Sequence, residues 1–320
     1  MSKISHTSLL SPVLLTLLSI IALLAGGQSF SFSALLIALR QSSVLGFLCI
    51  GLSLVVLTGT IDFSVGSIMG LGSCVCALIL SKNSDHVWIA VIAALLVCTL
   101  CGFLNGYLVT HLGFSASVIT FVQMFVISGI SMVFHDRIFE RLSSPVFFDI
   151  FNGKLFGLPT GSIAWVLTLA LISTALHHTY WGQYIYAIGD NEMALVNIGV
   201  NTSFYKILAY SSCGFFAGLA GIYTLGRLSV STSSTNISMV FEALTVLSIS
   251  GVGFSDSRGR LPALFLGTLS LAVVKICMTL YALSTGLQNV IVALIFFASL
   301  IFRKVIQNFW HTQGDSTLET

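Results

Sequence analysis

Long apolar stretches separated by short polar connections run along almost the whole chain. They are continuous, as in VWIAVIAALLVCTLCGFLNGYLV, rather than alternating with polar residues as the strands of a membrane barrel do. Because a helix needs about 20 mostly apolar residues to cross a hydrocarbon core of ~30 Å, we expect about ten transmembrane helices. The predicted spans are Leu9–Gly26, Leu35–Leu57, Phe63–Leu80, Val87–Val109, Ser117–Phe134, Ile163–Leu176, Ile207–Gly226, Val240–Gly251, Leu261–Leu283 and Leu287–Phe302.

Two of these spans, Ile163–Leu176 and Val240–Gly251, are short for a full crossing. They are expected to be tilted, broken or partly re-entrant, which is tolerated where protein covers the backbone. The composition supports a membrane protein, since 56% of the 320 residues are hydrophobic, 8% are charged and the mean hydropathy is +1.01. Soluble domains carry roughly 25% charged residues. We therefore expect an all-α, polytopic transmembrane helix bundle with one domain over residues 1–320, and transport is the leading class of function.

The charges are few and scattered, with a net charge of +2, so no nucleic-acid partner is expected. The N-terminus lacks a secretory cleavage site, so the first span is expected to be retained. Orientation follows from Lys and Arg near the span ends. A cytoplasmic N-terminus places Lys3, Lys206, Arg258, Arg260, Arg303 and Lys304 inside and Lys82, Arg137, Arg141, Lys154 and Arg227 outside. This bias is too small to decide the topology.

Three polar connections are longer than the rest: His135–Thr160, His177–Tyr205 and Arg227–Met239. The first contains two prolines and is expected to be a structured external loop or cap. The second predicts a short amphipathic helix, in which Asp190 or Asn191 caps the start and Glu192 suits the positive end of the helix dipole.

Gly199 stands where the predicted short helix needs a left-handed residue at its end. Ala194, Leu195 and Ile198 are expected to share one face. Such a helix either docks on a partner protein or lies on the lipid surface, and these residues alone favour neither role.

The segment TGTIDFSVGSIMGLG, Thr58–Gly72, places an acid between two spans. Asp62 precedes a helical run, so its carboxylate is expected to accept from the N–H of Ser64 or Val65. An ionisable residue near the membrane interior is also a functional candidate, although capping is the commoner use. In the third polar cluster, Ser250–Arg260, charged side chains form either a surface loop or a contact with a cytoplasmic partner.

Arg40, Glu242 and Lys275 lie near or within apolar runs, where charges are costly. Arg40 stands near the start of its span and is expected to snorkel to the interface. Lys275 lies deep in its span, so it belongs either to a polar pathway or to a structural ion pair, with Glu242 as its possible partner.

Small residues recur four apart at Gly66/Gly70, Gly102/Gly106, Gly214/Gly218 and Ala217/Gly221, which predicts close helix packing. Cys98 and Cys101 form a C-x-x-C without a second pair or nearby histidines, so packing is the favoured role. No phosphate loop, H-E-x-x-H or catalytic triad context is present, and no catalytic residue, cofactor or metal is expected. A nucleotide-driven cycle would need another chain.

Four segments in order resemble the membrane permease subunits of bacterial ABC importers for simple sugars, the ribose/galactose/autoinducer-2 branch. They are TGTIDFSVGS (Thr58–Ser67), YAIGDNEMALVNIGVN (Tyr186–Asn201), CGFFAGLAGI (Cys213–Ile222) and SGVGFSDSRG (Ser250–Gly259). The resemblance covers nearly the whole chain. The motif residues that it singles out are Gly59, Asp62, Ser64, Gly66, Gly251 and Gly259.

The resemblance implies a multi-pass protein of the bacterial inner membrane with no chemistry of its own. Its implied partners are cytoplasmic ATP-binding subunits, a second permease subunit in a homo- or heterodimer, and a periplasmic sugar-binding protein. The Asn191–Gly199 helix would dock on the ATPase, which also favours the cytoplasmic N-terminus. The residues implied in this coupling are Asn191, Glu192, Ala194, Leu195, Ile198 and Gly199.

Several positions depart from the pattern of that family. Ser250, Ser255 and Ser257 replace glycine or other small residues, Asp190 replaces a glycine, and Leu195 replaces an alanine. These changes are typical of a divergent member, an unusual substrate or the weaker half of a heterodimer.

The expected function is translocation of a simple sugar by alternating access, driven by ATP on partner subunits. The alternative is an ATP-independent secondary transporter of a small polar solute, which should use intramembrane acids for ion coupling. Asp62 and Glu242 are the only candidates, and both lie near span ends. A membrane enzyme would need clustered catalytic residues, and the sequence contains none.

Overall fold

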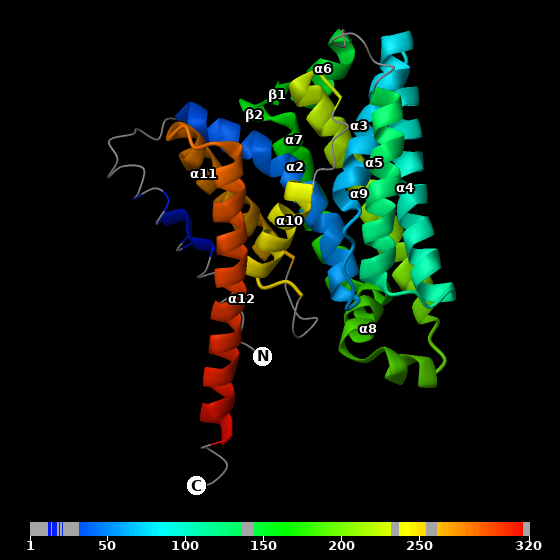
Figure 1. Cartoon of the computed structure of the whole chain (residues 1–320), viewed down its shortest axis with the longest axis vertical. Coiled ribbons are helices and arrows are strands. Elements are labelled where there is room, and N and C mark those ends of the chain that lie inside the picture. The colour runs from blue at the N-terminus through cyan, green and yellow to red at the C-terminus, as the bar shows by residue number, and fades with distance from the viewer. Residues whose placement is uncertain are drawn as a thin grey trace.

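The computed structural model describes residues 32–135, 144–231, 237–253 and 261–315, with side chains up to 305, and isolated positions between 12 and 21. The helices are α2 (Phe32–Leu57), α3 (Val65–Lys82), α4 (Val87–His111), α5 (Ala116–His135), α6 (Pro145–Asn152), α7 (Thr160–His178), α8 (Tyr180–Asn197), α9 (Thr202–Leu228), α10 (Ile237–Ile249), α11 (Ala263–Leu280) and α12 (Thr285–Asp315). The strands β1 (Lys154–Leu155) and β2 (Leu158–Pro159) form a small antiparallel hairpin. The predicted helical, polytopic bundle is confirmed (Figure 1).

Eight helices of the described residues are long and apolar enough to cross a membrane, against about ten that the sequence predicts. The predicted span Ile163–Leu176 is longer than expected, because α7 has 19 residues. In contrast, α10 has 13 residues and reaches only about 20 Å, too short for a crossing. The first predicted span, Leu9–Gly26, lies outside the described residues except for isolated positions.

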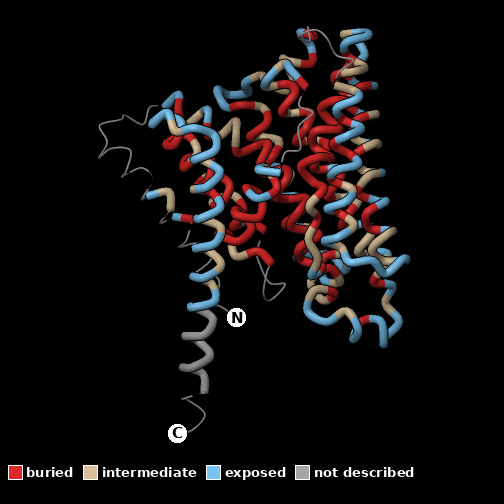
Figure 2. The backbone as a smooth tube through the Cα atoms, in the orientation of Figure 1, coloured by how far each residue is buried: buried red, intermediate tan, exposed pale blue. Residues whose placement is uncertain are grey.

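α9 lies at the centre of the bundle and packs against α2, α3 and α4, as well as α6 and α8. α2 crosses the molecule diagonally and also contacts α7, α10 and α11 (Figure 1). Burial follows this arrangement: 72% of the most apolar window of α3 is buried, against 6% of that of α12 (Figure 2). The exposed faces of α4, α5, α7 and α12 are apolar, as expected for helices solvated by lipid or by another membrane subunit.

Glycines allow α9 to approach its neighbours at backbone distance. A Cβ atom at Gly102 of α4 would overlap the carbonyl oxygen of Tyr210, and one at Gly214 of α9 would overlap that of Cys98. A Cβ atom at Gly221 would overlap the carbonyl oxygen of Met69 in α3. These crossings confirm the packing role predicted for Gly102, Gly214 and Gly221, and Cys98 is a buried part of the same contact.

The polar connections divide between two ends of the bundle. The α8 end carries α8, residues 58–64 and residues 112–115, and the α6 end carries α6, the hairpin and residues 83–86 (Figure 1). Lys206 lies at the α8 end, whereas Lys154 and Arg227 lie at the α6 end. α6 and the hairpin also confirm that the connection His135–Thr160 is structured, with residues 136–143 outside the description.

Candidate functional site

The predicted short helix is the second half of α8, a longer helix with a kink. The backbone at Asn191 is non-helical, with φ −160° and ψ 91°, and the Asn191 side-chain oxygen accepts from the N–H of Ala194 at 3.1 Å. Of the two candidate caps, the structure therefore selects Asn191 rather than Asp190. Gly199 has φ +83° and directly follows the last turn, the conformation predicted for it.

The first half of α8, from Tyr180, was not expected as a helix. Thr179 caps it by accepting from the N–H of Gly182 at 3.4 Å. Ile185 and Ile188 are buried against the bundle, and Trp181 packs against the same core. The helical spacing of these three apolar residues is the sequence signal that could have revealed this half.

An ion pair joins the second half of α8 to the start of α9, and one apolar side chain of the same helix is buried. Lys206 donates to a carboxylate oxygen of Glu192 at 2.5 Å, and the Leu195 side chain is buried. Glu192 follows the Asn191 cap, so its charge also suits the positive end of the local helix dipole. The short helix is thus fixed in direction before any partner binds.

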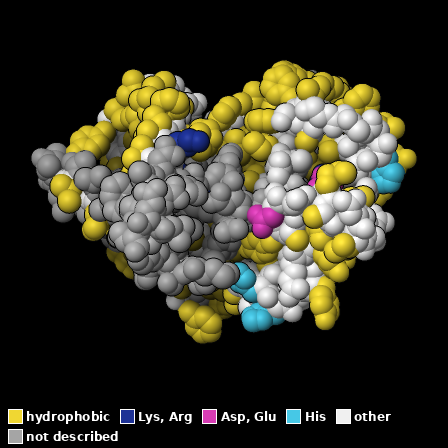
Figure 3. Space-filling model, turned by 90° about the horizontal axis from the view of Figure 1, so that it is seen from below, with side chains coloured by type: hydrophobic (Ala, Val, Ile, Leu, Met, Phe, Trp, Pro, Cys, Tyr) yellow, Lys and Arg dark blue, Asp and Glu magenta, His cyan; other side chains and the backbone are white. Residues whose placement is uncertain are grey.

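The other side of this helix is exposed and apolar. Met193 is 66% exposed, Val196 47% and Ile198 74%, and Ala194 is also exposed. The expectation that Ala194, Leu195 and Ile198 share one face is wrong for Leu195, because that side chain points into the bundle. Figure 3 views the molecule from the α8 end and shows hydrophobic side chains at this surface among polar atoms.

A buried polar cluster lies at the same end, between α2 and α3. Asp62 is fully buried, and one of its carboxylate oxygens accepts from the Ser64 N–H at 2.8 Å and from the Ser64 hydroxyl at 2.6 Å. This confirms the predicted cap from Asp62 to the N–H of Ser64. The Asn105 amide of α4 donates to Ser64 Oγ at 2.8 Å and to the second Asp62 oxygen at 3.4 Å.

Further hydrogen bonds tie this cluster to α5 and α9. The Tyr210 hydroxyl of α9 donates to Thr60 Oγ1 at 3.0 Å, and Thr120 of α5 accepts from the N–H of Phe63 at 3.1 Å. Burial raises the pKa of Asp62 above its usual value, and the hydrogen bonds from Ser64 and Asn105 oppose that rise. The cluster joins residues 58–64 to three helices.

The polar cluster also lies next to α8. Gly59 has φ +81°, and a Cβ atom there would be 3.8 Å from the Cα of Gly189, two residues before the α8 kink. A displacement of α8 would therefore reach the α2–α3 connection directly.

Lys275 of α11 and Glu242 of α10 form the ion pair that the sequence suggested. Lys275 Nζ lies 2.6 Å from Glu242 Oε1, and the Glu242 side chain is 7% exposed. The pair links α11 to the short α10, where a lone charge would be costly. This geometry fits the structural alternative.

Among the remaining motif residues, Gly251 has φ +73° and follows α10. Its carbonyl oxygen accepts from the Arg303 guanidinium of α12 at 3.4 Å, and that of Gly253 accepts at 3.0 Å. Gly66 is buried in the first turn of α3. Gly259, together with Ser255 and Ser257, lies outside the described residues.

The sequence-based interpretation missed Asn105 and Tyr210. Asn105 interrupts an otherwise apolar run in its span, and this isolated amide was the available signal. Tyr210 carries no local signal, since its partner Thr60 is distant along the chain.

Comparison with known proteins assigns the family. Residues 34–300 match the family described as "Branched-chain amino acid transport system / permease component". This chain belongs to that permease family. It is therefore a transport component rather than an enzyme, and a multi-span protein of the bacterial inner membrane.

Individual relatives of this permease import ribose, fructose or autoinducer 2 according to their names. It is 30% identical over 294 residues to the ribose import permease protein RbsC of Escherichia coli K12. The matched region covers 90% of each chain. It is 29% identical over 276 residues to the fructose import permease protein FrcC of Rhizobium meliloti, covering 83% of this chain and 76% of the relative. It is 28% identical over 288 residues to the autoinducer 2 import system permease protein LsrC of Photorhabdus luminescens, covering 86% and 83%.

Proposed function

We propose that this permease is the membrane-spanning subunit of an ATP-binding-cassette importer that moves a simple sugar inward by alternating access. The observation that carries the proposal is the similarity to the ribose permease over 90% of both chains. The fructose import permease and the autoinducer 2 import permease extend that similarity to relatives with other named solutes. These relatives favour a sugar over the amino acids in the description of the family.

The α8 surface is the proposed docking site for a cytoplasmic ATP-binding subunit. Met193, Val196 and Ile198 form an exposed apolar patch, and Leu195 and the Glu192–Lys206 pair hold it in place. A pre-oriented helix loses little conformational freedom on binding, and this supports docking over a loose lipid contact. The α8 end is then cytoplasmic and the α6 end periplasmic, where a sugar-binding protein would deliver the solute.

A second permease subunit, identical or homologous, is proposed to complete the translocation path. The nearly unburied α12 and the apolar outer faces of α4, α5 and α7 leave room for such a subunit. The Gly59–Gly189 approach gives a route by which movement of α8 reaches the α2–α3 connection and the spans that it joins.

The proposal is tested by purifying the tagged full chain in mild detergent and identifying nucleotide-binding subunits that accompany it. We expect an ATPase subunit and ATP hydrolysis with the wild type. The double variant Ala194→Glu/Ile198→Glu places two charges on the exposed surface and should reduce recovery at least tenfold, since an unpaired charge in an apolar contact is costly.

The matched control is Val146→Glu, which changes an exposed apolar residue on the short helix α6 at the other end. It should retain the ATPase. Absence of any ATPase from wild-type complexes, together with uptake that survives ATP depletion, would contradict the importer proposal. Equal recovery with both variants would contradict the docking site alone.

Secondary transport by ion coupling is the second candidate, and buried Asp62 is the observation that favours it. An acid whose pKa is raised by burial binds a proton more readily than an exposed carboxylate does. However, hydrogen bonds from Ser64 and Asn105 hold both of its oxygens, and Glu242 is paired with Lys275. Uptake abolished by a proton ionophore at constant ATP would favour this candidate.

A polar pathway through Lys275 and Glu242 stays a prediction. We favour a structural ion pair, since each head group neutralises the other at 2.6 Å. The double variant Lys275→Met/Glu242→Leu distinguishes the two roles: it should preserve uptake if the pair is structural and abolish it if the charges line the path.

A further inference from the structure

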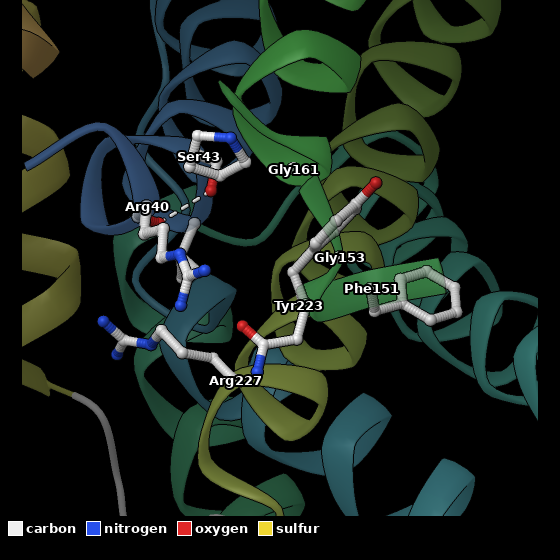
Figure 4. Close-up of a pocket in the computed structure, with 10 residues that line it drawn as sticks. Arg40, Ser43, Phe151, Gly153, Gly161, Tyr223 and Arg227 are labelled. Carbon is white, nitrogen blue, oxygen red and sulfur yellow. Dashed lines mark hydrogen bonds between the residues drawn. The ribbon is translucent and has the colours of Figure 1, made fainter. Parts of the chain in front are cut away.

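A small pocket at the α6 end contains two arginines from different helices. Arg40 of α2 and Arg227 of α9 line it, together with Phe151 and Tyr223. Figure 4 shows both arginine side chains along the same side of the pocket. The remaining lining residues are Ser43, Val44, Asn152, Gly153, Pro159 and Gly161.

The rest of the pocket is rigid and shaped by close contacts. The Phe151 ring meets the Tyr223 ring edge-on, with centroids 5.1 Å apart, and Tyr223 also stacks on Phe47 at 5.3 Å. A Cβ atom at Gly161 would lie 3.0 Å from the Tyr223 ring and from Ser43 Oγ. The walls therefore come from α2, α7, α9 and the end of α6, so the two guanidinium groups are held by well-packed elements.

The charge in this pocket is not balanced by the described residues. The ion pairs in the described part of the chain are Lys206–Glu192 and Lys275–Glu242, and neither includes Arg40 or Arg227. The Arg227 Nε–H is buried and has no hydrogen-bond acceptor among the residues that the structure describes. A buried donor without a partner and two neighbouring like charges are both costly, unless an anion joins them.

The backbone adds to the positive potential. Pro159 and Gly161 line the pocket at the beginning of α7, a helix of 19 residues. The N-terminal turn of a helix presents N–H groups and the positive end of its dipole. This potential has the same sign as that of the two arginines.

We propose that this pocket binds an oxyanion, a carboxylate or phosphate group, between Arg40 and Arg227. The planar guanidinium fork matches the paired oxygens of both groups, and Asn152 supplies a further amide. The oxyanion belongs either to a free solute or to a phospholipid headgroup at the membrane surface. This inference goes beyond the proposed function, since it concerns anion binding and not sugar import.

The test uses the full chain in a neutral detergent. Inorganic phosphate and glucuronate are titrated at constant ionic strength while the midpoint of thermal unfolding is recorded. We expect a saturable rise in the wild-type midpoint with at least one of them. Arg227→Gln and Arg40→Gln should each weaken apparent binding at least tenfold, as expected for loss of a charge-assisted hydrogen-bond pair.

Two further variants separate the guanidinium geometry from general charge. Lys154→Gln removes an exposed positive charge at the same end and should bind like wild type. Arg227→Lys keeps the charge without the fork and should recover only part of the affinity. Native mass spectrometry of the same samples identifies any retained phospholipid.

The outcomes distinguish the two sources. A response to the soluble probes that is lost in both Gln variants supports a free solute anion. No such response, combined with a phospholipid that is retained by wild type and lost from the same variants, supports a lipid headgroup. No binding of either kind, or equal loss in Lys154→Gln, overturns the proposal.

Discussion

Two groups of polar side chains, one at each end of the bundle, differ in how their members are paired. At the α8 end, Asp62, Ser64 and Asn105 hydrogen-bond to one another, and only Asn105 Oδ1 of these groups lacks a partner. At the α6 end, Arg40 and Arg227 share a pocket without an anion among the described residues. The first arrangement holds helices together, whereas the guanidinium groups of the second can still bind an anion.

Whether polar groups are paired with one another therefore distinguishes structural groups from binding groups, and both kinds are rare in this protein. A cluster whose donors and acceptors satisfy one another stabilises the fold in which it occurs. A set of like charges is expected to stabilise the fold only when its counter-ion is present. The predictions below test this contrast by changing one end at a time.

The largest effect is expected from Gly102→Ala, which disturbs the helix that carries Tyr210 into the α8-end cluster. The new methyl group would overlap the backbone carbonyl of Tyr210, so α4 and α9 must separate. We expect a loss of about 3 kcal/mol in unfolding free energy, as for severe overpacking. Thermal unfolding in detergent measures it.

Gly129→Ala is the matched control, because a Cβ atom at Gly129 of α5 meets nothing within 4 Å. Alanine is the better helix former, so this variant should be equal to wild type or up to about 1 kcal/mol more stable. Similar losses in the two variants would mean that backbone approach at Gly102 is not what joins α4 to α9.

Asn105→Leu should have the next largest effect. It removes the amide that donates to Asp62 and Ser64 and leaves a buried carboxylate with fewer donors. The expected loss is about 2–3 kcal/mol, the penalty for an under-satisfied charged group. Asn289→Leu, at an exposed position of α12, is the control and should change stability little. Unchanged stability of Asn105→Leu would mean that this polar cluster does not stabilise the α8 end.

Most of the fold could be predicted, because a bilayer imposes a single strong rule on the sequence. Eight of the predicted spans coincide with long apolar helices, since about 20 apolar residues are required wherever a chain crosses. Whether α10 spans the membrane could not be predicted, because this short helix packs between α2, α11 and α12 and its length is not set by the membrane.

The α8 surface could be predicted in part, since Asn191 and Gly199 mark helix ends by local chemistry. The burial of the Leu195 side chain could not be predicted, because it depends on how the short helix lies against the rest of the fold. The same holds for the Arg40–Arg227 pocket: the sequence indicated snorkelling for Arg40, and only the fold brings these residues together. In each case the missing information was which residues, distant along the chain, lie together in the fold.

A smaller effect is expected from Asp62→Asn, and its sign depends on pH. Burial raises the pKa of Asp62, so the folded state favours the protonated form. Its contribution to stability is fully present below the usual pKa of 3.8 and is lost as the pH rises through the higher folded value. The wild type should therefore lose stability relative to the asparagine variant as the pH rises above about 4.

At neutral pH, Asp62→Asn should lie within about 1 kcal/mol of wild type, because an amide oxygen can still accept from Ser64. Unfolding midpoints of the two proteins across the pH range provide the measurement. Parallel pH profiles would mean that Asp62 keeps its charge in the folded state without cost, and that the donors around it outweigh its burial.

The smallest effect is expected from Arg40→Gln in the absence of added anions, and this makes it the sharpest test of the contrast. Removing one of two like charges should leave stability unchanged or raise it by about 0.5 kcal/mol, whereas Asn105→Leu at the other end lowers it. Whichever of inorganic phosphate and glucuronate the wild type binds should then stabilise it and not Arg40→Gln, so the order of the two proteins reverses with the anion. Unfolding midpoints with and without that anion measure this reversal. A clear loss of stability without any anion would mean that Arg40 already has a partner, and that the two ends of the bundle follow the same rule.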